Sequence, residues 1–190
     1  LALMPNSWII RNELGEAYLK AGRHLDAINV YSESARITGD SHHSAETFYI
    51  LGVIYWKADE KDQSLSSLTK ALSLGLTGVK SHIAHSIIAD GHKFAGRDLT
   101  TDDYIRAINI NPQDTGAYYY LGNKYYDLGE YLNAFGSYEI ASLQHPDHAL
   151  SHLGKGKSFY HLGNISDAIG SFEQSILRQP DLIEAHYHLG

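Results

Sequence analysis

The fold of this chain is decided by residues 118–146, which read YYYLGNKYYDLGEYLNAFGSYEIASLQHP. Tyr118, Leu121 and Tyr125 are separated by three and then four residues. Side chains at this spacing lie on one face of a helix, so the first half of the stretch predicts an amphipathic helix. The second half carries the same kind of signal at Ala134, Tyr138 and Ala141. Residues 118–146 therefore predict two consecutive helices, each with one apolar face.

Glycine and proline mark the turns of this helix pair. Gly129 suits a tight turn between the two helices, and Pro146 ends the second helix because it has no N–H and a fixed φ. Gly122 interrupts the apolar face of the first helix, where a glycine costs roughly 0.5–1 kcal/mol relative to alanine. We expect this cost to be offset because the missing side chain lets the second helix approach closely.

The same pattern returns along the chain. Gly156 follows Gly122 after 34 residues. The other matching positions of this later copy are His152, Lys155, Phe159, Gly163, Ala168, Phe172, Ser175 and Pro180. Two earlier copies centre on Gly15 and Gly52, and a divergent copy before Pro112 keeps only the closing half of the pattern. Five copies in phase predict a repeat architecture.

These residues resemble the tetratricopeptide repeat, whose signature is W-x2-L-G-x2-Y…A-x3-F…P with a period of 34 residues. The resemblance covers the whole chain and implies an all-α fold, a right-handed superhelical solenoid of antiparallel helix pairs. Four positions depart from the signature. Arg11 and His85 replace the leading aromatic residue, Lys155 replaces the leucine, and His92 stands where an aromatic residue is usual.

We expect a single array over residues 1–190. Residues 1–7 end a preceding repeat, and the complete repeats are 8–44, 45–78, 79–114 (divergent), 115–148 and 149–182, followed by the start of a sixth at 183–190. The longer distance from Gly15 to Gly52, 37 residues, is assigned to a polar loop at residues 38–44. Neither end resembles the polar cap of a repeat array, so we expect the chain to be an excerpt from a longer protein.

The composition argues against several kinds of partner. The formal net charge is −7 and the 15 lysines and arginines are dispersed, so no nucleic-acid partner is expected. No apolar run approaches the roughly 18 to 20 residues of a membrane-spanning helix, so no membrane insertion of this segment is expected. The absence of cysteine excludes disulfides and fits a reducing or an oxidising compartment, with the cytoplasm slightly favoured.

The sequence contains no motif of a catalytic, cofactor or metal site. It has 12 histidines but neither His-Glu-x2-His nor cysteine-based spacing, so we expect no bound metal. Gly-x-Ser-x-Gly and the phosphate-binding Gly-x4-Gly-Lys-Ser/Thr are also missing, so we expect no cofactor and no enzyme activity. The acidic pair Asp102-Asp103 is interpreted as the start of a helix, where negative charge suits the helix dipole.

The resemblance implies a concave surface, lined by the first helix of each repeat, that receives peptides or partner helices. Residues two or three before the signature glycine, and one or four after it, lie off the packing face. These offsets select Tyr49, Trp56, Tyr119, Tyr120, Asn123, Tyr126, Lys157 and Tyr160 as partner-binding candidates. Tyrosine and tryptophan dominate binding hot spots. The same offsets around Gly156 also select Leu153 and Gly154.

Three functions follow from this interpretation. The first is a protein–protein interaction scaffold that binds an extended peptide or partner helix in the concave groove. The second is a regulatory or substrate-recruiting repeat segment of a larger enzyme, such as a glycosyltransferase. The third is a self-assembling structural array that associates through its uncapped ends. The carboxylate clamp of chaperone-binding relatives is not assembled here, because only Asn12, Asn123 and Lys157 stand at comparable positions.

Overall fold

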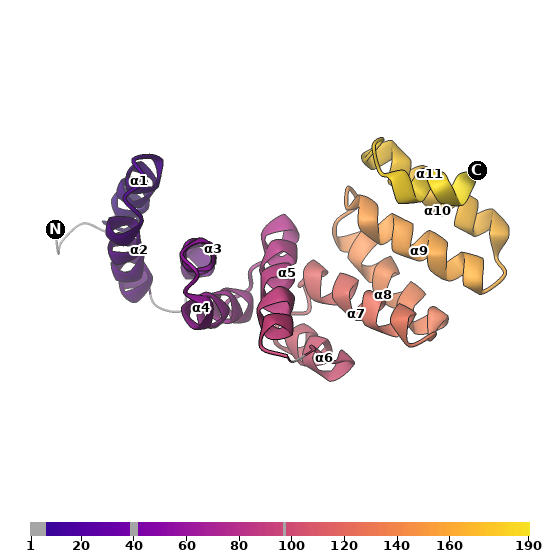
Figure 1. Cartoon of the computed structure of the whole chain (residues 1–190), viewed down its shortest axis with the longest axis horizontal. Helices are drawn as coiled ribbons and strands as arrows, with labels where there is room; N and C mark the ends of the chain where they lie inside the picture. The colour runs from indigo at the N-terminus through magenta and orange to yellow at the C-terminus, as the bar shows by residue number, and fades with distance from the viewer. Residues whose placement is uncertain (1–6, 39–41, 97) are drawn as a thin grey trace. The chain divides into compact units, whose positions relative to one another are not determined.

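A computed structural model describes residues 7–38, 42–96 and 98–190, all of which belong to helices or to the turns between them (Figure 1). The chain divides into two units, Leu1–Asp98 and Leu99–Gly190. Unit 1 contains α1 (Ser7–Lys20), α2 (His24–Thr38), α3 (His42–Lys57), α4 (Lys61–Ser73) and α5 (Gly78–Phe94). Unit 2 contains α6 (Thr101–Ile110), α7 (Thr115–Asp127), α8 (Tyr131–Gln144), α9 (Ala149–His161), α10 (Ile165–Arg178) and α11 (Ile183–Leu189). The predicted all-α fold is confirmed.

Four helix pairs share the same turn. Helices α1 and α2, α3 and α4, α7 and α8, and α9 and α10 pack together, and three residues connect the members of each pair. In the α7–α8 turn the N–H of Gly129 donates to the carbonyl of Tyr126 at 3.0 Å, and the N–H of Glu130 donates to that of Tyr125 at 2.8 Å. Equivalent bonds close the other three turns. A connection this short makes the two helices of each pair antiparallel.

The middle residue of each turn adopts the left-handed conformation that this double hydrogen bond requires. It is glycine in three turns, with φ of 71° at Gly22, 76° at Gly129 and 81° at Gly163. In the α3–α4 turn the position is held by Asp59, with φ of 63°. The prediction that Gly129 forms the turn is confirmed.

The signature glycines lie directly against a large side chain of the second helix. A Cβ atom added at Gly122 would lie 2.7 Å from the ring of Tyr138, and one at Gly156 would lie 2.5 Å from the ring of Phe172. Gly15 faces Tyr31 in the same way. The expected close approach of the helices is therefore confirmed, and these positions accept no larger residue without a shift of the ring.

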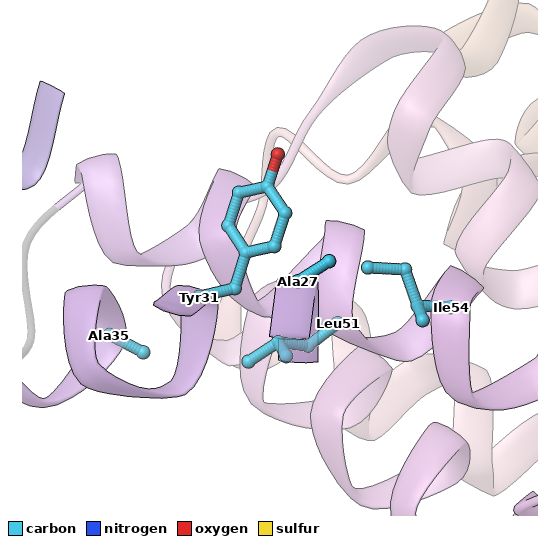
Figure 2. Close-up of a cluster of buried hydrophobic side chains, with 5 residues drawn as sticks. All are labelled: Ala27, Tyr31, Ala35, Leu51 and Ile54. Atoms are coloured by element: carbon cyan, nitrogen blue, oxygen red, sulfur yellow. The ribbon is translucent and has the colours of Figure 1, made fainter. Parts of the chain in front are cut away.

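The hydrophobic core is built between successive helix pairs. In unit 1, Ala27, Tyr31 and Ala35 of α2 pack with Leu51 and Ile54 of α3 (Figure 2). In unit 2, a second cluster joins Leu153 of α9, Ala168 and Phe172 of α10, and Ala185 of α11. Because each second helix packs on the first helix of the following pair as well as on its own partner, neighbouring repeats stabilise one another.

The divergent third repeat, expected at residues 79–114, contains α5 and α6, and the division between the two units falls between these helices. Within unit 1, α5 packs on α3 and α4, and Gly91 lies against Leu65. Within unit 2, α6 packs on α7. The expected start of α6 is confirmed, since Thr100 and Asp103 form a reciprocal capping box.

The predicted loop at residues 38–44 is partly wrong. Helix α2 continues to Thr38 and α3 begins at His42, so residue 38 and residues 42–44 of the expected loop are helical. The ring of His43 lies 4.2 Å from that of Trp8 in α1, and Ser44 is fully buried. These tertiary contacts favour helix over the loop that the polar composition suggests. Residues 39–41 lie outside the described part of the chain, as do residues 1–6 of the repeat fragment expected at residues 1–7, whose last residue, Ser7, begins α1.

Candidate functional site

Helix α7 presents Tyr119, Asn123 and Tyr126 on one face, at spacings of four and three residues. Asn123 is held in place because its Oδ1 accepts a 2.7 Å hydrogen bond from the hydroxyl of Tyr138. The ring of Tyr119 lies 5.9 Å from that of Tyr138 and meets His148 edge-on at 5.1 Å. Burial raises the pKa of the Tyr119 phenol, against a smaller lowering by its hydrogen bond to Asn123. This face therefore presents neutral rings and an amide in fixed positions.

Lys157 of α9 extends the α7 face to the next repeats. Its ammonium lies 4.9 Å from the centre of the Tyr126 ring and 2.7 Å from a carboxylate oxygen of Glu184 in α11. The lysine side chain is 26% exposed and the glutamate 49%, so water screens the pair and its net contribution is about 0–1 kcal/mol. Its main effect is to link three successive first helices, α7, α9 and α11, by polar and cation–π contacts.

A second group of rings continues this surface toward the helix turns. Tyr131 stacks on His161 with ring centres 4.3 Å apart, and Tyr126 meets both rings edge-on. Tyr160 lies next to this group, with its ring centre 5.8 Å from that of His161. Tyr160 is 56% exposed, which leaves its ring available for contact. We call Tyr119, Asn123, Tyr126, Lys157, Tyr160 and Glu184 the α7–α9–α11 surface.

Tyr120 has a different environment from the other candidate rings of α7. It stacks on Tyr104 of α6 with ring centres 5.9 Å apart and planes 13° apart. Tyr104 itself is 2% exposed and belongs to the core. Tyr120 therefore contributes to the packing of α6 on α7.

In unit 1, Tyr49 lines a pocket of about 220 Å³. Its lining residues are Leu19, His24, Tyr49, Ile50, Val53, Ile54 and Lys57. Burial raises the pKa of Tyr49, and the nearby charge of Lys80 opposes this change. A second hollow of about 300 Å³ lies among α2, α3 and α4, and Phe48, Tyr55 and Arg36 are among its lining residues.

Trp56 does not line either hollow. The ammonium of Lys61 lies 4.4 Å from the centre of its indole ring and also pairs with Asp59 at 2.7 Å. Trp56 is half-buried and is partly covered by this lysine at the α3–α4 turn.

The structure thus brings five of the eight candidates together in unit 2, namely Tyr119, Asn123, Tyr126, Lys157 and Tyr160. Two others, Tyr49 and Trp56, belong to unit 1. The offsets were wrong for Leu153, which is 4% exposed and belongs to the core, and for Gly154, which lies beneath the ring of Tyr138. Gly154 lies against α8 in the same way as Tyr120, at the equivalent offset of α7, lies against Tyr104 of α6.

Sequence reasoning missed His148, His161 and Glu184, which contact the predicted rings and lysine. Glu184 occupies a position held by Leu150 and Gly116 in the two preceding repeats, so the repeat pattern contains no signal for it. No cluster of three or more metal-ligating side chains occurs among the residues that the structure describes, and no described helix has the length and apolar character needed to cross a bilayer.

Comparison with known proteins identifies the family. Two sequence models of the tetratricopeptide repeat match residues 7–75 and 119–182. The chain belongs to the tetratricopeptide repeat superfamily. Tetratricopeptide repeat arrays are protein-interaction scaffolds, in which stacked helix pairs create an extended binding surface.

Several individual proteins are similar to this tetratricopeptide repeat chain. The human Protein O-mannosyl-transferase TMTC1 is 23% identical over 175 residues, which cover 74% of this chain and 20% of that protein. The chain therefore spans about a fifth of the length of this curated relative. A tetratricopeptide repeat protein from Parabacteroides merdae superposes with a TM-score of 0.58 at 18% identity, covering 97% of this chain and 71% of that one. YrrB, described as having an unusual peptide-binding site, superposes with a TM-score of 0.52 at 18% identity, covering 93% and 89%. These structures are similar in fold.

Proposed function

We propose that this chain is an interaction scaffold that binds an extended peptide or a partner helix along the α7–α9–α11 surface. One observation supports the proposal above others: Tyr126, Lys157 and Glu184, from three successive first helices, form one linked surface. Tyr160 adds an exposed ring beside it. Such a surface offers large contact area, fixed hydrogen-bonding groups and little loss of side-chain freedom on binding.

The packing of the rings suggests how a partner would be held. Tyr126 is supported by Tyr131, His161 and Lys157, so its ring is already ordered before a partner arrives. Ordered side chains lose less conformational entropy on binding, which favours affinity. Tyr119 and Asn123 both contact the core residue Tyr138, so their side chains are held in fixed positions on this surface.

A capture experiment with matched variants tests the proposal. The 190-residue chain is compared with Tyr126→Ala/Tyr160→Ala and with the control Leu143→Ala, whose side chain is 70% exposed on the second helix α8. Mass spectrometry of proteins captured from a lysate should show partners that the chain and the control retain and the double variant loses. Equal retention by all three proteins would contradict binding at this surface. Far-UV circular dichroism confirms that each variant is folded.

A second candidate function is supported by the similarity to human Protein O-mannosyl-transferase TMTC1. In this case the repeats form one segment of a larger mannosyltransferase-like protein, and they recruit its protein substrates while the chemistry takes place elsewhere. The full coding sequence tests this candidate directly. A glycosyltransferase domain in the same polypeptide would support it, and a full-length protein made only of repeats would rule it out.

A further inference from the structure

The 220 Å³ pocket of unit 1 has the properties of a site for one side chain. Its walls come from two repeats, with Leu19 of α1 on one side and Ile50, Val53 and Ile54 of α3 on the other. Pockets for drug-sized molecules usually begin at about 300 Å³, so this one is too small for such a ligand. A single buried side chain of a partner is the better match. Because the walls are mainly aliphatic, an aliphatic side chain would bury its surface against them.

Two basic side chains, His24 and Lys57, complete the lining, and no carboxylate contributes to it. Lys57 is exposed and forms no ion pair with any residue in the described part of unit 1. Other lysines of the unit differ in this respect, since Lys61 pairs with Asp59 and Lys80 pairs with Glu46. An apolar pocket with an uncompensated ammonium at its edge is complementary to an apolar group that lies beside an anion.

The source of the anion can be argued from the side chains that line the pocket. A carboxylate at the end of a chain is held best by several donors in a fixed, bidentate geometry. The lining of this pocket contains no arginine or asparagine, and Lys57 is its one lysine. Lys57 is a single point charge on a flexible stem, which suits one Asp or Glu side chain.

We propose that the pocket between α1 and α3 binds an aliphatic side chain of a partner peptide whose adjacent residue is Asp or Glu, with the acidic side chain paired to Lys57. The inference rests on the proposed scaffold function and names the chemistry of one anchor point. It assigns a binding role to Tyr49 and Val53 in the pocket wall and to Lys57 at its edge.

A peptide-display experiment supplies the probe. A library of random linear peptides, displayed with both ends blocked, is selected on the full 190-residue chain. Enriched sequences should share an internal aliphatic–acidic pair. One such peptide is then synthesised with a fluorescent label, and its affinity is measured by fluorescence anisotropy.

Two variants test the two parts of the site separately. Val53→Phe fills the pocket and should weaken binding about tenfold or more, as expected for loss of a buried anchor. Lys57→Glu should weaken binding about three- to tenfold, with a smaller effect at high salt, because the contact is exposed. Lys93→Glu, an exposed lysine of α5 outside the pocket, is the matched control and should leave affinity within about twofold.

A charge swap makes the assignment of Lys57 specific. A peptide in which the acidic residue is replaced by lysine should bind the original chain weakly and bind the Lys57→Glu variant better. Recovery of this kind requires the two charges to be in contact, whereas a change in helix stability would not produce it.

The outcomes separate this inference from the proposed function. Peptides that lack the aliphatic–acidic pair, or that bind Val53→Phe and Lys57→Glu as well as the original chain, would overturn the inference and leave the scaffold function standing. Peptides lost only from Tyr126→Ala/Tyr160→Ala would overturn it in the same way and place binding in unit 2. Selection only from a library with free C-termini would overturn the choice of an Asp or Glu side chain. Failure of all peptides to bind would count against both proposals.

Discussion

The hydroxyl of Tyr138 donates a 2.7 Å hydrogen bond to Oδ1 of Asn123, across the α7–α8 pair. Tyr138 is 3% exposed, and burial raises the pKa of its phenol, so the hydroxyl remains a donor at every physiological pH. A residue of the candidate binding surface is thus fixed by the core beneath it. This relationship means that Asn123 contributes to stability as well as to the surface.

A double-mutant cycle measures that contribution. Asn123→Ala leaves the Tyr138 hydroxyl without its acceptor and should lower the free energy of unfolding by about 1–2 kcal/mol. Tyr138→Phe removes the donor, and the coupling energy between the two changes should be about 0.5–1.5 kcal/mol. Urea denaturation followed by circular dichroism gives all four values. A coupling energy near zero would show that the hydrogen bond contributes nothing to stability.

Two helical glycines, Gly154 against the Tyr138 ring and Gly170 in open space, predict a clear contrast. A Cβ atom at Gly154 would lie 2.6 Å from the ring, so Gly154→Ala should destabilise the chain by about 1–3 kcal/mol. No atom lies within 4 Å of a Cβ added at Gly170, which is a helical glycine in α10. Gly170→Ala should therefore stabilise the chain by about 0.5–1 kcal/mol through helix propensity. Thermal denaturation of the two variants should shift in opposite directions, and a shift of both in the same direction would refute the explanation.

Asp59 is the one non-glycine residue with positive φ in the described part of the chain. Because three equivalent turns use glycine, Asp59→Gly should relieve backbone strain and raise the free energy of unfolding by about 0.5–1 kcal/mol. The ion pair with Lys61 opposes this gain only weakly, since the Asp59 side chain is 85% exposed. The reverse change, Gly129→Asp, should be destabilising. Urea denaturation of both variants checks the pair, and a less stable Asp59→Gly variant would contradict the prediction.

His152 predicts a pH dependence of stability. Its Nε2 lies 2.9 Å from the carbonyl of Pro146, and burial lowers its pKa below the ordinary value of 6.5. Below pH 6.5, His152 is therefore protonated more readily in the unfolded chain than in the folded chain. The stability that the folded chain owes to a neutral His152 is fully present above pH 6.5, and it is lost as the pH falls through the lowered pKa of the folded state.

The measurement compares the chain with His152→Phe, which places an aromatic residue at the leading position of the repeat. The fall in melting temperature between pH 7.5 and pH 5 should be smaller in the variant than in the original chain. Carboxylates titrate equally in both proteins, so the difference between them reports on residue 152. Identical pH profiles would show that His152 does not contribute to the dependence.

Much of the fold could be predicted because its signals are local. The helix pairs follow from apolar spacing, and the turns follow from glycines such as Gly129 whose left-handed conformation other residues resist. The loop at residues 38–44 was partly mispredicted because contacts distant in sequence, such as Trp8 with His43, extend a helix into polar residues. Such contacts cannot be inferred from the polar composition of residues 38–44.

The candidate surface could be predicted only in part. Spacing identifies which residues leave the packing face of their own helix, and this selected Tyr126 and Lys157. It does not show what the neighbouring helix places over them, so it grouped Tyr120, which stacks on Tyr104, with Tyr160, which is exposed.

The sequence by itself determined the repeat, its helix pairs and the close approach at each signature glycine, because these depend on backbone conformation and on spacing within one repeat. Only the tertiary structure decided which rings pack against neighbouring repeats, which rings are exposed to solvent, and which residue pairs with Lys157. Those properties depend on which side chains the neighbouring repeats place against each residue, as the Lys157–Glu184 pair and the stacking of Tyr120 on Tyr104 show. Such contacts join residues of different repeats, and a 34-residue period does not encode them.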